Sequence, residues 1–194
     1  MLKTGAILLA SGRSERFGAN KLLADFGGRP MIARAMDALS ALPLARVAVV
    51  TAYPEIAALA RAYGFEPVEN AHPERGQAHS IALGVRALCD ADALLLLVGD
   101  QPLLTAASLE SLLDEYTRSA KRIACLRDST HMGNPAVFSS AYFPALMALE
   151  GDCGAKSILR AHEGDLLAVD CRGENELCDC DDPQALRALA GSMR

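Results

Sequence analysis

The sequence has no apolar run long enough to cross a membrane. A membrane-spanning helix needs about 18 consecutive apolar residues, and the longest run here, residues 93–99, has only the length of a strand. The first residues hold one lysine and a short apolar run that turns polar at Ser11, which is not the pattern of a signal peptide. We therefore expect no membrane partner.

Cysteines and basic residues are also too sparse for two common classes of protein. The six cysteines are scattered, and the pair Cys178 and Cys180 has neither a second pair nor a nearby histidine to complete a zinc site. We expect reduced thiols and a cytoplasmic location. The formal net charge is −5, which argues against nucleic acid as a partner.

What the sequence does contain is an alternation of short apolar runs and helical patterns, which is typical of the α/β class. Its 194 residues, 51% of them hydrophobic, suffice for one domain with a substantial core, and no linker or repeat divides residues 1–194. The expected strands are residues 5–10, 46–51, 65–69, 92–98, 122–126, 135–138 and 166–169. The expected helices are residues 30–42, 54–64, 77–89, 105–120, 141–149 and 155–161, with a last one starting at 182–183.

The loop after the first expected strand combines small residues with three cations. Ser11 and Gly12 let the backbone approach a ligand closely and offer N–H groups to phosphate oxygens. The cations that follow, Arg13, Arg16 and Lys21, suit a polyphosphate. The spacing of the glycines and the lysine matches neither a P-loop nor the GxGxxG of Rossmann proteins. We therefore predict a nucleotide site of another type.

Two acidic segments are candidates for a metal site. Asp100 follows the most apolar expected strand, and ligands of parallel sheets bind at the carboxyl ends of strands. Beside a triphosphate, one or two carboxylates can hold Mg²⁺; the alternative is an aspartate that only organises the turn before Pro102. Asp181, in the acidic cluster 179–182, is the second candidate, and there the alternative is that Asp182 caps the last helix while its neighbours are solvated.

Gly76 and Ser80 flank the start of the expected helix at 77–89. The amino terminus of a helix with such residues can receive the polar edge of a ligand. His79 in the same stretch could be a ligand or a base, but a polar residue at a helix start is the simpler interpretation. We leave His79, His72 and His162 outside the catalytic set. The turn-rich segments 131–138 and 151–156 can each be ordinary loops.

Together these motifs resemble the nucleotidyltransferases. The first loop is similar to their L-x-(A/G)-G-x-S-x-R-(M/F)-G-x-x-K signature, which it matches at Gly12, Ser14, Arg16, Phe17, Gly18 and Lys21. The Gly99-Asp100 pair resembles the family's G-D-x-P element. Residues 179–183 are similar to a (D/N)-x-(D/N)-T-P element, with Asp182 in place of the threonine.

Four features resemble one subgroup, the molybdopterin nucleotidyltransferases of the MobA-like family, in its cytidylyltransferase branch. Segment 131–138 is similar to G-(N/H)-P-(V/A)-(L/V)-F, and segment 151–156 to G-D-x-G-A-(R/K). The chain is short, and Ala10-Ser11 stands where the guanylyl branch tends to have Ala-Gly. The resemblance covers residues 5–189 and implies a three-layer α/β/α Rossmann-like nucleotidyltransferase fold with a mostly parallel mixed sheet.

The resemblance implies transfer of CMP from CTP to the phosphate of molybdenum-bound molybdopterin, with release of pyrophosphate, using Mg²⁺ or Mn²⁺. A client molybdenum hydroxylase would receive the product. Arg16, Lys21 and Asp100 would be catalytic, and Asp100 and Asp181 would hold the metal. The nucleotide would contact Leu9, Ala10, Ser11, Gly12, Arg13, Arg16, Lys21, Gly76, Ser80 and Gly99. The acceptor would contact Asn134, Gly151, Asp152, Gly154, Ala155 and Lys156.

Two other functions stay open at this point. A sugar- or polyol-phosphate nucleotidyltransferase could use the same first loop and Asp100. A non-catalytic accessory protein could bind nucleotide or finished cofactor and deliver it to a molybdenum enzyme. Pyrophosphate release with different nucleotides and phosphate acceptors separates these functions.

Overall fold

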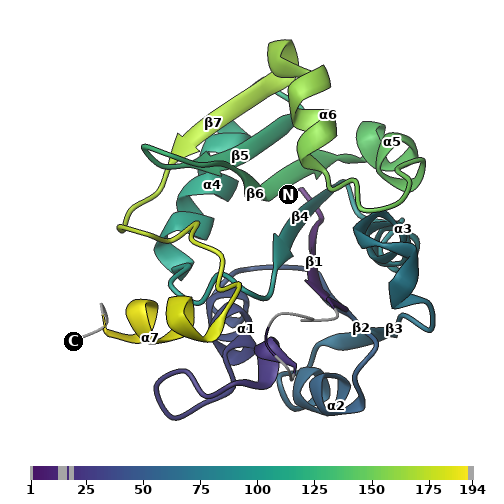
Figure 1. Cartoon of the computed structure of the whole chain (residues 1–194). Helices are drawn as coiled ribbons and strands as arrows, with labels where there is room; N and C mark the ends of the chain where they lie inside the picture. The colour runs from purple at the N-terminus through teal and green to yellow at the C-terminus, as the bar shows by residue number, and fades with distance from the viewer. Residues whose placement is uncertain (1, 13–16, 18–19, 192–194) are drawn as a thin grey trace.

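The computed structural model describes residues 2–12, 17 and 20–191, which form one seven-stranded sheet with helices on both sides (Figure 1). The strand order is β3-β2-β1-β4-β6-β5-β7. The strands are β1 (Thr4–Ala10), β2 (Arg46–Thr51), β3 (Glu66–Glu69), β4 (Ala93–Val98), β5 (Ile123–Arg127), β6 (Met132–Ser139) and β7 (Leu166–Asp170). All neighbouring strands run parallel except for β6, which is antiparallel to β4 and β5. The predicted mixed, mostly parallel sheet is confirmed.

The helices form the two outer layers. One layer is α1 (Ile32–Ser40), α2 (Pro54–Ala62), α4 (Ala106–Arg118) and α7 (Pro183–Gly191), and the other is α3 (Gln77–Ala87), α5 (Phe143–Met147) and α6 (Lys156–Ala161). Short 3-10 turns complete the structure: η2 (Lys21–Leu23), η3 (Pro73–Arg75), η4 (Ser140–Tyr142) and η5 (Glu163–Asp165). Within the described residues, no helix is long and apolar enough to span a membrane.

The central strands are apolar on both faces, since each face is covered by helices. In β1, Leu8 packs with the layer of α1 and α4, while Ile7 and Leu9 pack with the layer of α3 and α5. Successive strand residues point to opposite faces, so two separate cores fill the spaces between the sheet and the helices. This double burial explains why these strands appear in the sequence as continuous apolar runs.

The topology brings four pieces of the chain to one edge of the sheet. The loops after β1 and β4 lie at the same edge because these strands are parallel neighbours, with Leu9 paired to Val98. Strand β6 runs the other way, with Leu96 of β4 opposite Ala136. The start of β6 therefore lies beside the end of β4. After β7 the segment 171–182 returns to the same edge, where the Cys180 N–H donates to the Asp100 carbonyl at 2.8 Å.

Most expected elements differ from the observed ones by one or two residues at an end, and two of the differences have a clear physical reason. The helix expected at 141–149 is a 3-10 turn followed by the shorter α5, which begins at Phe143 because Pro144 fits only in the first turn of a helix. The strand expected at 135–138 starts at Met132, since a shift in the β5–β6 register between Cys125 and Leu126 carries the pairing past Pro135.

The approach of α3 to β1 gives the first prediction. A Cβ added at Gly84 would lie 2.5 Å from Ile7 Cγ2, and the buried, β-branched Ile7 has no room to turn away. We expect Gly84→Ala to lower the free energy of unfolding by about 1–3 kcal/mol, measured by urea denaturation.

The matched control is Gly164→Ala, because a Cβ there meets nothing within 4 Å. In a double-mutant cycle, Ile7→Ala removes the clash, so Gly84→Ala should cost much less in that background. Equal costs in both backgrounds would show that this contact does not limit helix packing.

Candidate functional site

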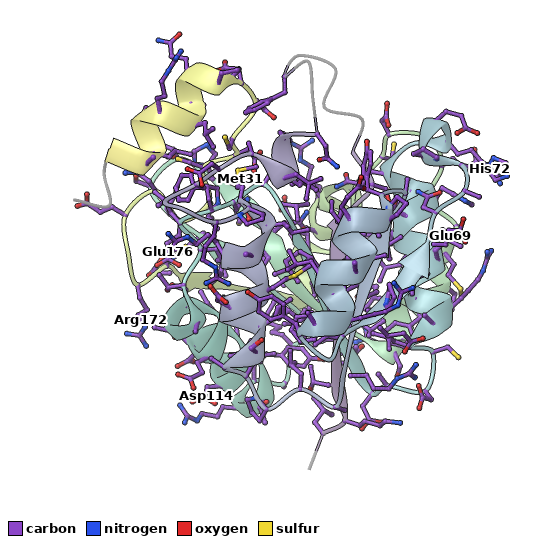
Figure 2. The ribbon with its side chains drawn as sticks, turned by 90° about the horizontal axis from the view of Figure 1, so that it is seen from below. Met31, Glu69, His72, Asp114, Arg172 and Glu176 are labelled. Atoms are coloured by element: carbon purple, nitrogen blue, oxygen red, sulfur yellow. The ribbon has the colours of Figure 1, made fainter. Side chains whose placement is uncertain are left out.

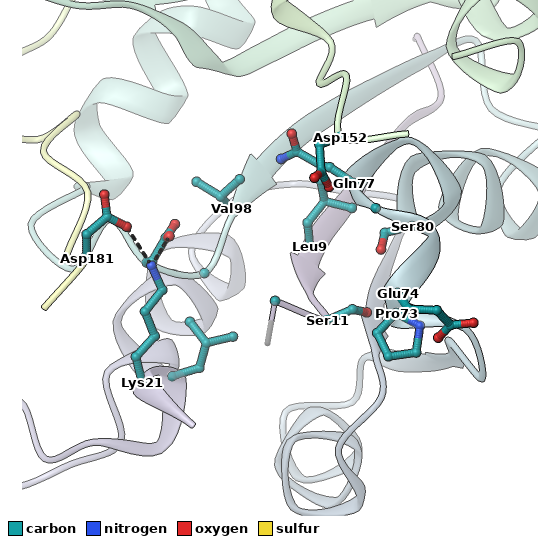
Figure 3. A pocket seen from close by; sticks show the side chains of 15 residues that line it. Leu9, Ser11, Lys21, Pro73, Glu74, Gln77, Ser80, Val98, Asp152 and Asp181 are labelled. Carbon is teal, nitrogen blue, oxygen red and sulfur yellow. Dashed lines mark hydrogen bonds and ion pairs between the residues drawn. The ribbon is translucent and has the colours of Figure 1, made fainter. Parts of the chain in front are cut away.

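A cleft of about 630 Å³ opens where β1 and β4 end (Figure 3). Its floor contains the backbone that follows β1 and β4, and its walls come from η2, from η3 with the start of α3, and from the returning segment 171–182. It is lined by nine of the residues that the sequence predicts for nucleotide or metal: Leu9, Ser11, Gly12, Lys21, Gly76, Ser80, Gly99, Asp100 and Asp181. Ala10 is buried at the end of β1. The predicted Arg13 and Arg16 lie outside the described residues.

The side chain of Lys21 joins two aspartates in this cleft. Its Nζ donates to Asp100 Oδ2 at 2.7 Å and to Asp181 Oδ1 at 3.0 Å (Figure 3). The side chain of Lys21 is 13% exposed, that of Asp100 21% and that of Asp181 59%. Burial lowers the pKa of Lys21, but the two carboxylates outweigh it and the net pKa is raised. Lys21 is therefore a cation at neutral pH.

Local packing fixes where Lys21 and Asp100 stand. The Asn20 side chain accepts from the Leu22 N–H at 3.1 Å and starts the 3-10 turn, and the buried Leu22 holds that turn on the core. Gly99 leaves space that Leu22 and Ile32 occupy, since a Cβ there would lie 3.3 Å from both side chains. Asp100 consequently leaves the sheet next to the turn that carries Lys21.

Gln101 ties the acidic segment to the same edge. Its Nε2 donates to Asp179 Oδ1 at 3.1 Å and to the Leu177 carbonyl at 3.3 Å. Desolvation and the neighbouring Asp100 carboxylate raise the pKa of Asp179. Three carboxyl groups, those of Asp100, Asp179 and Asp181, thus gather near Lys21. Two of these carboxylates, those of Asp100 and Asp181, contact the Lys21 ammonium directly.

The acidic groups can hold a divalent cation only together with other ligands. In the part of the chain that the structure describes, no three His, Cys, Asp or Glu side chains are grouped so as to hold a metal ion. Asp100 and Asp181 nevertheless both reach the Lys21 ammonium. Mg²⁺ is commonly bound by one or two carboxylates plus substrate phosphates and water. The donor set therefore fits a metal that arrives with a nucleotide.

The start of α3 closes the opposite wall. Gly76 has a φ of 83° and a ψ of −178°, a conformation essentially restricted to glycine, and a Cβ there would lie 2.4 Å from the Gly151 carbonyl oxygen. That carbonyl accepts from the Ala78 N–H at 3.1 Å. Asn70, 1% exposed, donates to Ser80 Oγ at 3.0 Å. The Ser80 oxygen accepts this bond, which leaves its O–H to donate to a ligand.

A second cleft of about 390 Å³ adjoins the first and shares Gln77, Val98 and Asp100 with it. Four of the residues predicted for the acceptor line this second cleft: Asn134, Gly154, Ala155 and Lys156. The other two are placed differently, because Asp152 lines the first cleft and Gly151 lies against the Gly76 turn. The segment 151–156 thus borders both clefts.

Sequence reasoning missed three side chains that organise the site: Asn70, Gln77 and Gln101. Asn70 directly follows β3, at the edge where ligands of such sheets bind, so its position was a usable signal. Gln101 occupies the variable position of G-D-x-P, and the burial that gives it three polar neighbours was not visible in the motif. Gln77 lies at the junction of the two clefts.

Comparison with known families decides what this site belongs to. The model of the MobA-like NTP transferase domain matches residues 6–166. The chain belongs to this family. The predicted family is confirmed, and its activity class is nucleotidyl transfer.

Similar proteins agree with this assignment. Purine catabolism protein PucB of Bacillus subtilis is 29% identical over 199 residues, covering 96% of each chain. The probable molybdenum cofactor guanylyltransferase of Pyrococcus horikoshii is 30% identical over 128 residues, covering 64% of this chain and 62% of that protein.

Three solved structures share the fold. A nucleotidyl transferase from Methanothermobacter superimposes with a TM-score of 0.83 at 21% identity, covering 97% of this chain and 96% of that one. Rv0371C of Mycobacterium tuberculosis in complex with manganese gives 0.77 at 21% identity, covering 99% and 100%. CMP:2-keto-3-deoxy-manno-octonic acid synthetase complexed with CTP gives 0.76 at 17% identity, covering 98% of each. These likenesses confirm the predicted fold.

The two glycines beside Gln77 give a paired prediction. Gly76→Ala is expected to lower the melting temperature and to raise the KM for nucleotide at least tenfold, because its backbone conformation and the Gly151 carbonyl both exclude a Cβ. Thermal melts and steady-state kinetics measure the two effects.

Gly154→Ala is the matched control. Its Cβ would lie 2.4 Å from Gln77 Oε1, the end of a side chain that can swing away, so the melting temperature should stay within about 2 °C. If both variants melt alike, the Gly76 conformation does not hold this wall of the cleft.

Proposed function

We propose that this chain transfers CMP from CTP to the phosphate of a molybdopterin-type acceptor and releases pyrophosphate. The observation that carries the proposal is the Lys21 ammonium between Asp100 and Asp181, in a cleft at the ends of two parallel strands. This arrangement suits a triphosphate with its metal. The backbone at the strand ends and the lysine can bind phosphate oxygens, and the carboxylate pair can bind the metal. The first cleft would take the donor nucleotide.

The chemistry needs positioned charge more than a catalytic base. An ionised acceptor phosphate is already a nucleophile at neutral pH and attacks the α-phosphorus in line with the leaving pyrophosphate. Lys21 would stabilise the negative charge that grows on the α-phosphate. The first-loop backbone with Arg16, and Arg13 nearby, would hold the β- and γ-phosphates. The alignment of donor and acceptor supplies the remaining rate enhancement.

Asp100 and Asp181 are the residues that would hold the metal. When bound, Mg²⁺ or Mn²⁺ would supply positive charge that offsets the negative charge of the reacting phosphates. The manganese complex of a protein with the same fold supports this choice. The Lys21 ammonium, which contacts both carboxylates in the structure, would supply a second positive charge to the same phosphates.

Cytosine is the proposed base. The Ser80 hydroxyl, oriented by Asn70, is a donor that suits a carbonyl such as O2 of cytosine. This feature does not by itself separate CTP from UTP or GTP. The cytidylyl choice rests on the similarity of segments 131–138 and 151–156 to that branch, and on the CTP complex of a protein with the same fold.

The second cleft would take the acceptor. Lys156 lines it and can pair with an acceptor phosphate. Two buried oxygens of lining residues, Gln101 Oε1 and Asn134 Oδ1, have no hydrogen-bond partner among the described residues. A buried acceptor without a partner lowers the stability of the protein. The N–H groups of a pterin ring can donate hydrogen bonds to these two oxygens. A molybdenum hydroxylase is the proposed client for the product.

Loss of either charge at the centre should nearly abolish turnover. We expect Lys21→Ala and Asp100→Ala to lower kcat about 10²–10³-fold, measured as pyrophosphate release. The matched controls are Lys3→Ala and Asp90→Ala, which remove another lysine–aspartate pair before β1 and after α3. Near-normal turnover in a folded Lys21→Ala or Asp100→Ala protein would contradict these roles.

Nucleotide and acceptor choice is tested separately. With CTP and a molybdopterin acceptor the purified chain should release pyrophosphate, and Ser80→Ala should raise the KM for CTP about tenfold, as expected for one lost hydrogen bond. GTP, UTP and sugar phosphates are the competing substrates. Turnover on a sugar phosphate would favour the sugar-nucleotide alternative. Binding of CTP without turnover on a competent acceptor would favour an accessory protein.

A further inference from the structure

Glu176 is a buried carboxylate that takes no part in either cleft. It lies in the segment 171–182, is 1% exposed, and accepts hydrogen bonds on both oxygens. Oε2 accepts from the Thr105 N–H and from Thr105 Oγ1, both at 3.0 Å. Oε1 accepts from Ser108 Oγ at 2.9 Å and from the Gly173 N–H. A buried carboxylate with four donors is fully paired and ordered.

Three of the four donors belong to the start of α4, and the fourth, the Gly173 N–H, belongs to the same segment as Glu176. Thr105 caps that helix, and its Oγ1 accepts from the Ser108 N–H at 3.2 Å. Ser108 Oγ donates to Glu176 and accepts from the Arg172 N–H at 2.7 Å. Figure 2 shows Glu176 and Arg172 on the same flank of the molecule. The negative charge of Glu176 also suits the positive end of the helix.

The same segment carries Asp181 into the site. Leu177, next to Glu176, is buried in the core, and its carbonyl accepts from Gln101. Cys180 is fully buried, and its N–H donates to the Asp100 carbonyl. Apart from these anchors, the segment lies between β7 and α7 without regular structure. Its position relative to the loop after β4 therefore depends on a few anchors, which are two buried side chains, one backbone hydrogen bond and the side-chain bonds of Gln101 and Glu176.

We infer that Glu176 is a positioning residue, which fixes the segment 171–182 on the start of α4 and so sets the place of Asp181 opposite Asp100. The inference rests on the proposed use of Asp100 and Asp181 as metal ligands. Ligands must be held to within about half an ångström of a productive geometry. Asp181 is more than half exposed and has little packing of its own, so the anchor supplies that order.

The variant that tests this inference is Glu176→Gln. It keeps the shape of the side chain but replaces one acceptor oxygen with an NH₂ group, which then faces hydrogen-bond donors. The Ser108 hydroxyl can rotate and accept a hydrogen bond from this group. The Gly173 N–H can only donate, so it would lose its acceptor. The matched control is Glu174→Gln, an exposed position two residues away.

We expect Glu176→Gln to raise the Mn²⁺ concentration for half-maximal activity about tenfold, with the KM for CTP at saturating Mn²⁺ within twofold of the parent. Excess Mn²⁺ should restore most of the turnover. Direct Mn²⁺ binding in the presence of CTP, followed by electron paramagnetic resonance, should weaken in parallel. A lower melting temperature with unchanged Mn²⁺ dependence would overturn the inference and leave Glu176 as a stabilising residue only.

Two further variants separate the possible failures. Ser108→Ala removes one of the four hydrogen bonds to Glu176 and serves as the test if Glu176→Gln does not fold. We expect it to raise the Mn²⁺ concentration for half-maximal activity about threefold. Asp181→Asn should show the largest loss of Mn²⁺ affinity. If Asp181→Asn leaves that affinity unchanged, the proposed metal site is wrong and the inference falls with it. If Asp181→Asn loses affinity while Glu176→Gln and Ser108→Ala do not, only the inference fails.

Discussion

The ion pairs of Lys21 with Asp100 and Asp181 are the constraint on which the site depends. They join the turn after β1 to the loop after β4 and to the segment that returns from β7, across sequence separations of 79 and 160 residues. A partly buried charge of one sign is tolerated only beside the opposite charge, and removing one partner leaves the others uncompensated. The three segments are therefore held at one place by electrostatics as well as by packing.

The topology of the sheet explains why two clefts lie side by side. The parallel neighbours β1 and β4 end together and build the first cleft. The reversed strand β6 starts where β4 ends, so Asn134 lines the second cleft, beyond Asp100. A parallel strand in that place would bring its carboxyl end to this edge and its start to the other. One antiparallel strand thus places two clefts at this edge, with Asp100 and Gln77 lining both of them.

Sequence reasoning predicted the parts of this structure that depend on local pattern. The strand at residues 5–10, which the structure shows as Thr4–Ala10, was predicted from its apolar length, and Asp100 from its place after the most apolar strand. Asp181 needed the resemblance, because an acidic cluster before a helix has a simpler explanation as a cap. The side chain of Asp182 does accept from the Gln184 and Ala185 N–H groups.

What could not be predicted depends on contacts between distant segments. In the sequence, nothing distinguishes Glu176 from an exposed charged residue in a loop. Only the fold shows that Thr105 and Ser108 donate hydrogen bonds to it. The division of the segment 151–156 between two clefts likewise depends on the Gly76 turn, 75 residues away from Gly151. Neither contact leaves a periodic or compositional signal, since each is made by one side chain or one turn.

The charge states at the centre agree with chemistry that proceeds without a general base. Because the fold raises the pKa of Lys21, the stabilisation from this lysine is complete below its ordinary pKa and is lost only as pH rises through the higher folded value. A phosphate monoester takes up its second negative charge near pH 6. Between these limits the lysine is a cation and the proposed acceptor is an ionised nucleophile at the same time. The protein therefore has to align charges that already exist at neutral pH. The contacts that hold η2, the loop after β4 and the segment 171–182 determine how accurately these charges are placed.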